Sequence, residues 1–444
     1  MREKSVFREF LKYASLNVMG MIALSCYILA DTFFVSKALG ANGLAALNLA
    51  IPVYNFINGS GLMIGMGGGT KYSIFKSQGK TKEANQVFTN AVALLIMIAA
   101  VYFLLGIFGS AQIARLLGAD DTVFEMSRTY MQILLLFAPM FMSNNLLLCF
   151  IRNDGAPQLA MAAMITGSLS NVVLDYVFMF PLEMGIFGAV LATGLAPVIS
   201  ILVMSPYLFT KKNQFHLTKC RITGSRSIGI LSSGLPSLIT EVSSGVVIIV
   251  FNMIILGLAG NTGVAAYGVI ANLSLVVTAI YNGISQGVQP ILSSNYGRGS
   301  RENVQAILRY AITSAVIISA CVYFCMFFFS GPVAAVFNSE GNATLQSIAE
   351  GGLKIYFTGS VFAGINIILS IYFTSTERPL PGQIISIMRG IVVIVPMSFL
   401  LSAIGGIAGV WAAYPATELV VCLTGAALYV LYNKKGQGTA EKAR

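Results

Sequence analysis

Long apolar segments recur along the whole 444-residue chain, and short polar stretches separate them. An α-helix needs about 20 apolar residues to cross a bilayer, and twelve segments of this sequence are long enough to do so. They cover residues 14–36, 45–70, 88–110, 127–150, 158–180, 186–209, 229–257, 265–292, 306–330, 353–375, 383–403 and 407–432. The pattern therefore predicts an all-α, polytopic membrane protein with twelve transmembrane helices.

The composition agrees with a membrane environment. Hydrophobic residues make up 56% of the chain and charged residues only 10%, and the mean hydropathy is +0.79. Soluble domains carry about 25% charged residues. A chain this apolar cannot cover its surface with polar groups in water, so we expect a multi-pass protein of the plasma (inner) membrane.

The formal net charge of +10 raises the question of a nucleic-acid partner. If the N-terminus is cytoplasmic and the helices alternate in direction, most Lys and Arg residues fall on the cytoplasmic side, Arg152 among them. Only four basic loop residues fall outside: Lys37, Arg115, Arg128 and Lys354. This asymmetry follows the positive-inside rule. We therefore expect both termini in the cytoplasm and no nucleic-acid partner. Separately, we expect a monomer in the lipid bilayer.

The two halves of the chain resemble each other in sequence. "ALGANGLAALNLAI" (38–51) matches "LAGNTGVAAYGVIA" (258–271), and "MGIFGAVLAT" (184–193) matches "GGIAGVWAAY" (405–414), in almost the same register. Six helices per half make this a parallel repeat, and repeats of this kind are common in transporters that bind substrate between the halves. We predict two pseudo-symmetric six-helix lobes, 1–209 and 228–444, joined by a cytoplasmic linker, 210–227.

Two acidic residues lie inside predicted spans of the first half. Asp31 lies in "YILADTFFV", and Asp175 follows Asn171 by four residues on one face of the fifth helix. A charged group at the bilayer centre costs at least ~2.5–3.5 kcal/mol, so a functional role is favoured over an acid satisfied by its own helix backbone. Together with Thr193 of the sixth helix, these oxygens suit Na⁺. They suit proton exchange equally, because two close carboxylates do not both ionise readily.

The second half supplies a different polar set. Glu241 follows Pro236 in the seventh helix, and Gln286 and Gln289 precede Pro290 in the eighth. We expect Glu241, Gln286 and Gln289 to line a substrate cavity between the halves.

The remaining polar residues and motifs argue against enzyme activity and against ATP binding. Arg389 and Glu418 lie in the eleventh and twelfth helices, and the sequence leaves open whether they form a structural ion pair or take part in transport. The single histidine, His216, lies in the linker, so no Ser-His-Asp or Cys-His set can form in the membrane, and we expect no enzyme activity. The Walker pattern of ATP-binding proteins is missing, and we expect no cofactor other than a coupling ion.

The combined motifs resemble the multidrug and toxic compound extrusion (MATE) family over nearly the whole chain. They are Asp31, N-x-x-x-D at 171–175, Thr193, G-x-P-x-x-x-x-E at 234–241 and Q-P-I-x-x-x-N-x-G at 289–297. The resemblance implies two lobes arranged as a V and a coupling ion held by Asp31, Asn171, Asp175 and Thr193. It also implies that Tyr130 lies near that ion and that Glu241 faces the cavity.

We therefore interpret the sequence as a secondary antiporter. It would export amphipathic, cationic organic compounds in exchange for Na⁺ or H⁺. The alternative is a flippase for lipid-linked sugars or other lipids on a related fold. A flippase for pyrophosphate-linked lipids would need Arg or Lys inside the membrane, and in the sequence only Arg389 qualifies.

Overall fold

The computed structural model describes residues 2–338 and 341–441, with the backbone alone described for residues 2–4 and 434–441. The C-terminal residues 442–444, which the sequence places in the cytoplasm, lie outside the described residues. The first half contains α1 (Arg2–Ser77), α2 (Thr81–Phe108), α3 (Ser110–Leu116), α4 (Phe124–Leu136), α5 (Ala138–Asn153), α6 (Pro157–Met179) and α7 (Gly185–Leu208). The second contains α8 (Gly224–Gly297), α9 (Arg301–Phe328), α10 (Ser330–Phe337), α11 (Ala343–Tyr356), η1 (Phe357–Gly359), α12 (Ser360–Ser375), α13 (Pro379–Ile387), η2 (Met388–Val392) and α14 (Ile394–Glu441).

These helices provide the twelve predicted spans. Within the described ranges, eight helical stretches are long and apolar enough to cross a membrane, and α4 with α5 forms a ninth span bent by 46°. Three of the stretches contain two spans each, because a glycine interrupts α1, α8 and α14. Helical hydrogen bonding satisfies the backbone of the spans internally, as a bilayer requires.

The glycine breaks show that the halves are repeats. Gly40 (φ 64°, ψ −152°) and Gly260 (φ 61°, ψ −159°) have nearly the same conformation and belong to the matching sequence segments 38–51 and 258–271. Gly185 and Gly406 form a second pair of glycines with positive φ, in the other pair of matching segments. Side chains with a Cβ rarely adopt positive φ, so each half needs a glycine at these turns. The twelve-helix, two-lobe prediction is confirmed.

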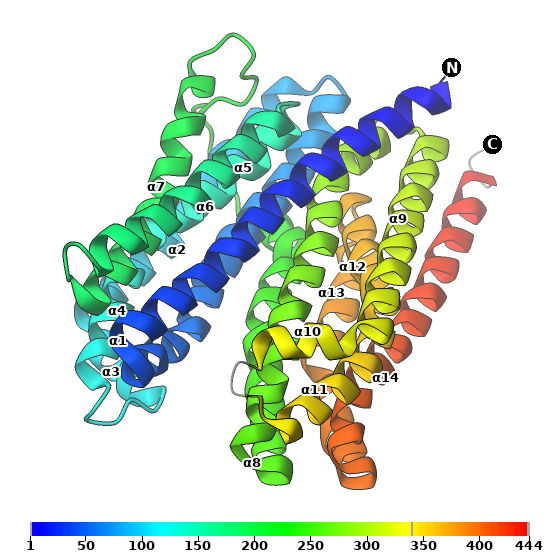
Figure 1. Ribbon diagram of the computed structural model, residues 1–444. Coiled ribbons are helices and arrows are strands. Elements are labelled where there is room, and N and C mark those ends of the chain that lie inside the picture. Colours follow the sequence, from blue (N-terminus) through cyan, green and yellow to red (C-terminus); the bar gives the residue numbers. More distant parts are fainter. Residues whose placement is uncertain (1, 339–340, 442–444) are drawn as a thin grey trace.

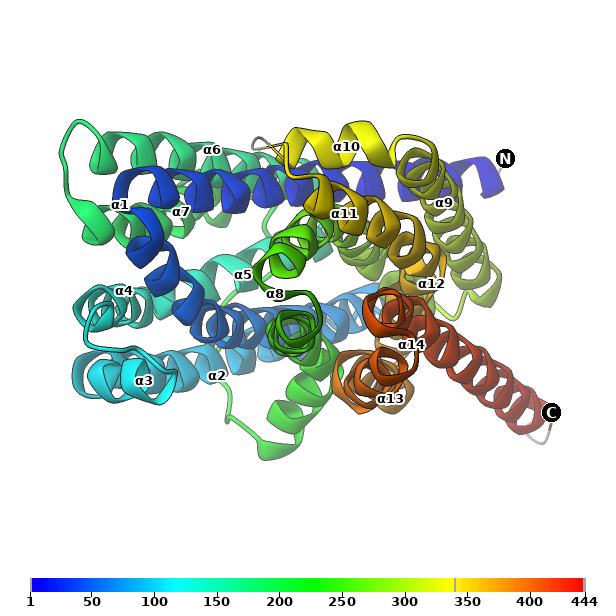
Figure 2. The ribbon, with the colours of Figure 1, turned by 60° about the horizontal axis from the view of Figure 1, so that its bottom comes forward.

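The two lobes have separate apolar cores and spread apart at one end. Most side chains of one buried cluster come from α1–α7, and most of the other come from α8–α14. Residues near the start of α1, such as Phe10 and Tyr13, pack with the second cluster. The lobes meet at the end that carries both termini and diverge toward the opposite end (Figure 1). The same division is visible from a second direction (Figure 2).

Two helix crossings without intervening side chains hold the lobes together. Gly234 of α8 lies against the backbone of Met63 in α1, and Gly287 of α8 lies against Tyr13 and Ala14 in α1. Small residues at such crossings let helix backbones approach closely in a membrane. This contact closes the space between the lobes at the end with the termini.

The crossing makes a prediction about the balance between open and closed states. A Cβ at Gly234 would collide with the Met63 backbone. Overpacking of this kind costs about 1–3 kcal/mol, and a cost near 1.4 kcal/mol corresponds to about tenfold in an equilibrium. In a protein without native cysteines, Ala14→Cys should be poorly reactive because Ala14 is buried here, and adding Gly234→Ala should raise its rate of thiol labelling about tenfold.

The matched control is Gly257→Ala on the same helix, where a Cβ would meet nothing within 4 Å. This variant should label Ala14→Cys at the parent rate. Equal rates for the two alanine variants would show that the crossing does not limit separation of the lobes.

Candidate functional site

A cavity of about 230 Å³ lies between the lobes, on the divergent side of their contact. Helices α1, α5, α6 and α7 provide its wall in the first lobe and α8 its wall in the second. Aromatic and apolar groups such as Tyr27, Tyr54 and Phe141 form much of this wall. Mostly apolar walls with a few polar groups are typical of small-molecule sites.

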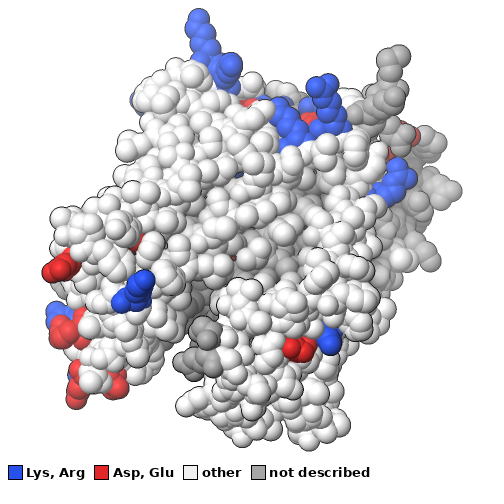
Figure 3. All heavy atoms as spheres, in the orientation of Figure 1, with Lys and Arg blue, Asp and Glu red and all other residues white. Residues whose placement is uncertain are grey.

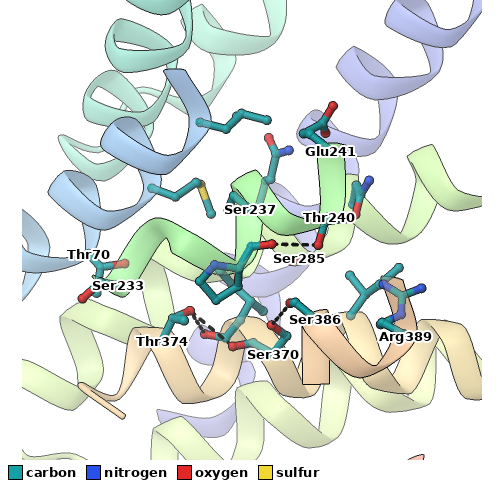
Figure 4. A pocket seen from close by; sticks show the side chains of 17 residues that line it. Thr70, Ser233, Ser237, Thr240, Glu241, Ser285, Ser370, Thr374, Ser386 and Arg389 are labelled. Carbon is teal, nitrogen blue, oxygen red and sulfur yellow. Dashed lines mark hydrogen bonds between the residues drawn. The ribbon is translucent and has the colours of Figure 1, made fainter. Parts of the chain in front are cut away.

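A smaller pocket of about 60 Å³ adjoins the cavity and extends into the second lobe. The two spaces share Thr240, Glu241 and Gln286 as lining residues. Figure 4 shows hydroxyl side chains turned toward this pocket, with Glu241 and Arg389 at its margin. The hydroxyl residues are Thr70, Ser233, Ser237, Thr240, Ser285, Ser370, Thr374 and Ser386. Hydroxyl groups therefore form much of the lining of this smaller pocket.

Glu241 bridges the two lobes from the cavity wall. Its Oε2 accepts a hydrogen bond from Asn58 Nδ2 of α1 at 3.1 Å. Asn58 Oδ1 accepts in turn from Asn145 Nδ2 of α5 at 2.8 Å. Among the described residues Glu241 has no ion-pair partner, so its charge is available to a cation entering the cavity.

The structure places Gln289 away from the cavity lining predicted from the sequence. Its side chain is fully buried between the lobes. Its Nε2 donates to Thr70 Oγ1 at 3.0 Å, and its Oε1 accepts from Asn153 Nδ2 at 2.9 Å. It lies about one helical turn beyond Gln286 along α8, and its bonds to Thr70 and Asn153 make it part of the lobe contact.

Arg152 corrects the charge assignment made from the sequence. The sequence assigns it to a cytoplasmic loop, but it is the penultimate residue of α5 and only 1% exposed. Its Nη1 donates to Asn17 Oδ1 at 2.6 Å and to Gln286 Oε1 at 2.8 Å, so it joins the two lobes. The guanidinium lines the central cavity and has no carboxylate partner in the described ranges. The fourth span predicted from the sequence ends at residue 150 and so leaves Arg152 in a loop. In the structure α5 continues to Asn153, and this extension places Arg152 in the buried part of the helix.

The five residues predicted for the coupling site come together inside the first lobe. Asp31 lies on α1, Tyr130 on α4, Asn171 and Asp175 on α6, and Thr193 on α7, and all are buried. With its amide nitrogen facing Asp175, Asn171 donates to Asp175 Oδ2 at 3.0 Å and accepts from the Thr193 backbone N–H at 3.2 Å. Tyr130 interacts electrostatically with both acids.

The two carboxyl groups have unused hydrogen-bonding capacity. Asp31 Oδ1 and Asp175 Oδ1 are buried and accept no hydrogen bond within the described part of the chain. The acids also interact with each other electrostatically. Two unpartnered buried negative charges would be costly, so the pair needs a bound cation or a proton.

The donor set is compatible with either one. Carboxylate, amide and hydroxyl oxygens are ligands that small hard cations prefer, and Thr193 Oγ1 keeps accepting capacity while it donates to Ala189 O at 3.1 Å. Thr193 also lines the central cavity, so the site lies directly behind the cavity wall.

Arg389 and Glu418 form a buried, two-point ion pair in the second lobe. Arg389 Nη2 donates to Glu418 Oε1 at 2.8 Å, and Nε donates to the same oxygen at 3.1 Å. Asn366 Nδ2 donates to Glu418 Oε2 at 2.7 Å. The charges of this pair satisfy each other, in contrast to Asp31 and Asp175.

Comparison with known proteins agrees with this architecture. The MatE family profile matches residues 18–177 and 236–400. The multidrug export protein MepA of Staphylococcus saprophyticus is 25% identical over 448 residues, covering 99% of this chain and 97% of MepA. MepA of Staphylococcus aureus strain MRSA252 is 24% identical over 449 residues, with the same two coverages.

Solved structures share the fold. The outward-facing conformation of a multidrug resistance MATE family transporter of the MOP superfamily matches with a TM-score of 0.90 at 23% identity, over 98% of this chain and 96% of that one. A MOP superfamily transporter from Pyrococcus furiosus, described as having a binding pocket of reverse polarity, matches with a TM-score of 0.87 at 23% identity, over 94% and 93%. With the family profile matching most of its length, the chain belongs to the MatE family and is a multi-pass membrane transporter, not an enzyme.

Proposed function

We propose that this transporter exports amphipathic organic cations from the cell in exchange for Na⁺ or H⁺. The observation that carries the proposal is the buried acid pair Asp31 and Asp175, each with one oxygen that accepts no hydrogen bond within the described residues. The pair lies directly behind the wall of an aromatic cavity that contains Glu241. The multidrug export named for the MepA relatives supports the same function.

The cavity favours amphipathic cations as substrates. Its aromatic and methionine side chains, Met21 and Met164 among the latter, can adapt to apolar groups of different shapes. Glu241 is the acidic residue in the lining, and it is held by a neutral amide that a substrate ammonium can replace. A cation at Glu241 would release Asn58 and so weaken one bridge between the lobes.

The lipid-flippase alternative has less support in the cavity. Arg389 is neutralised by Glu418. Arg152 lines the cavity, but Asn17 and Gln286 occupy its Nη1 group as part of the lobe contact. Among the described residues that line the central cavity, a pyrophosphate group would therefore find one cationic side chain, already engaged in holding the lobes together.

Coupling requires that ion and substrate favour different states of the lobes. A ligand shifts a conformational equilibrium only through its different affinity for the two states. Asp31, Asp175 and Asn171 lie on α1 and α6, and Thr193 connects their site to the cavity wall. We propose that cation or proton binding here draws α1, α6 and α7 together and reshapes the cavity that holds the substrate.

The surface charges suggest the orientation in the membrane. Lys and Arg side chains gather at the end with the termini, where the lobes meet (Figure 3). By the positive-inside rule that end faces the cytoplasm. We propose that both termini are cytoplasmic and that the cavity faces outward in this structure.

The carboxylate pair provides the first test. Asp31→Asn and Asp175→Asn should each reduce gradient-driven export by reconstituted protein to background. A single remaining acid cannot bind and release the coupling Na⁺ or H⁺ as the pair does. The double variant should be no worse than either single one, since the residues act in one network. Separate Na⁺ and H⁺ gradients would identify the coupling ion, and Na⁺-dependent thermal stability would report ion binding without transport.

Asp121→Asn is the matched control, because Asp121 is exposed and pairs with Arg115 on the surface. It should export at the wild-type rate. Wild-type export by Asp31→Asn would overturn the proposed coupling site.

The substrate charge can be tested at Glu241. Glu241→Gln should weaken binding of an organic cation by about tenfold or more, since a lost charge-assisted contact is worth about 1.5–3 kcal/mol. Binding of a neutral analogue of the same shape should change little. Fluorescence titration of purified protein measures both affinities, and Glu125→Gln at an exposed position is the control. Equal losses for both ligands would assign Glu241 to packing and not to charge recognition.

The orientation predicts which positions can be labelled from outside. In a cysteine-free background, an impermeant thiol reagent added to intact cells should label Asn261→Cys, beside the turn at Gly260, and should not label Ser77→Cys or Ser225→Cys. Permeabilised cells should label all three and show that each site is reactive. Labelling of Ser225→Cys in intact cells would contradict cytoplasmic termini.

A further inference from the structure

A third cavity, of about 350 Å³, lies in the second lobe at the end with the termini. It shares no lining residue with the two central pockets. Its lining comes from the ends of α8, α9, α12 and α14 and from the turn before α13. These residues are Tyr296, Gly299, Arg301, Val304, Gln305, Tyr372, Thr376, Arg378 and Asn433.

The corresponding place in the first lobe is filled by the linker. After α7 the chain turns back, and Phe215 is buried with its ring 4.9 Å from Phe88 and 5.7 Å from Phe150. The preceding residue, Gln214, donates its backbone N–H to Asp154 Oδ2 at 3.0 Å. The linker is therefore fixed against the first lobe at the end with the termini.

The second lobe has an equivalent site, but no aromatic residue corresponding to Phe215 fills it in the described part of the chain. When the prolines that begin α6 and α13 are aligned, Tyr372 corresponds to Phe150. A separate match, shifted by one residue, aligns "NKKGQG" (433–438) after the twelfth span with "TKKNQF" (210–215) after the sixth. In this match Gly438 aligns with Phe215. The backbone of α14 remains helical to Glu441 and does not turn back as the chain after α7 does. In the described ranges no segment covers the pocket as the linker does.

The charge of the two places is also reversed. Asp154 occupies the first-lobe site, where Lys76 Nζ lies 2.6 Å from its Oδ1. The same alignment places Thr376 opposite Asp154, and Arg378 and Arg301 line the pocket around it. Neither arginine forms an ion pair within the described part of the chain, and the neighbouring acid at position 377 is exposed.

The backbone adds to the positive potential. Arg301 is the first residue of α9, and Arg378 directly precedes the first residue of α13. The first N–H groups of α9 are unpaired within the helix, and the helix dipole favours an anion at such an end. At α13 two of the first three residues are prolines without an N–H, so the contribution there comes mainly from the dipole. Arg378 Nη1 donates only to the Tyr432 carbonyl, at 3.3 Å, which leaves most of its guanidinium donors for a ligand.

We propose that this pocket binds the anionic phosphate headgroup of a phospholipid from the leaflet at the end with the termini. The neighbouring side chains favour a lipid over free phosphate, since Leu380 and Leu431 are 57% and 56% exposed, lie close in sequence to pocket residues and offer a surface for acyl chains. Basic pockets between transmembrane helices bind such headgroups on the cytoplasmic side. A bound headgroup would join the ends of several helices of the second lobe.

The experiment measures thermal unfolding of the full-length protein in detergent with added lipid. Phosphatidylglycerol should raise the unfolding temperature by about 2–4 °C, whereas phosphatidylcholine and inorganic phosphate should not. Arg301→Gln/Arg378→Gln should lose this response. Arg8→Gln/Arg221→Gln removes the same charge from exposed positions on the same end and should keep it.

Native mass spectrometry of the same samples counts retained phosphatidylglycerol directly. If the double variant does not fold, the single variants Arg301→Gln and Arg378→Gln provide the same comparison. An unchanged response in the pocket variants, or an equal loss in the surface variants, would overturn the site. Equal stabilisation by inorganic phosphate would overturn the lipid assignment. The readout is stability, so it is independent of whether the proposed export is correct.

Discussion

The close crossing of α1 with α8 determines where this transporter can hold a ligand. Gly234 and Gly287 bring two helix backbones into contact at one end of the molecule. Amide and guanidinium groups, Arg152 and Gln289 among them, fill the remaining space there with hydrogen bonds between the lobes. Apolar side chains from the start of α1 also contact the second lobe there, since the Phe10 ring lies 5.9 Å from the Tyr310 ring. Separating the lobes at that end must therefore break apolar as well as polar contacts, while most of each core stays within its own lobe. The cavity exists where the same helices diverge, and it closes if they meet.

The scaffold is repeated, but the chemistry placed on it is not. The turns at Gly40 and Gly260 have the same conformation, yet aligning these turns places Phe251, fully buried in apolar surroundings, opposite Asp31. The first lobe thus holds acids with unsatisfied oxygens, whereas the charges in the core of the second lobe, Arg389 and its glutamate partner, satisfy each other. An ion can change the energy of the first lobe much more than that of the second. Ion binding therefore acts on one lobe of a scaffold whose two lobes are otherwise alike.

The ends of the two lobes differ in the same way. The linker packs Phe215 beneath the first lobe and moves with it, since the backbone N–H groups of His216 and Thr218 donate to Asn85 and Thr89 of α2. The second lobe presents arginines in a cavity that the described chain does not cover. Motion of the lobes relative to each other therefore needs a hinge where the linker enters α8.

Sequence by itself determined the features that depend on local chemistry. Twelve spans follow from the length of apolar segments, the lobes follow from a repeat at one register, and Asp31 and Asp175 stand out because an acid is costly in a bilayer. Asn171 could be assigned to Asp175 because residues four apart share a helix face. Only the tertiary structure placed Arg152 in the cavity and Gln289 in the lobe contact. Their positions depend on how α1, α5 and α8 are aligned against one another, and that alignment is set by packing between residues that lie far apart in the chain.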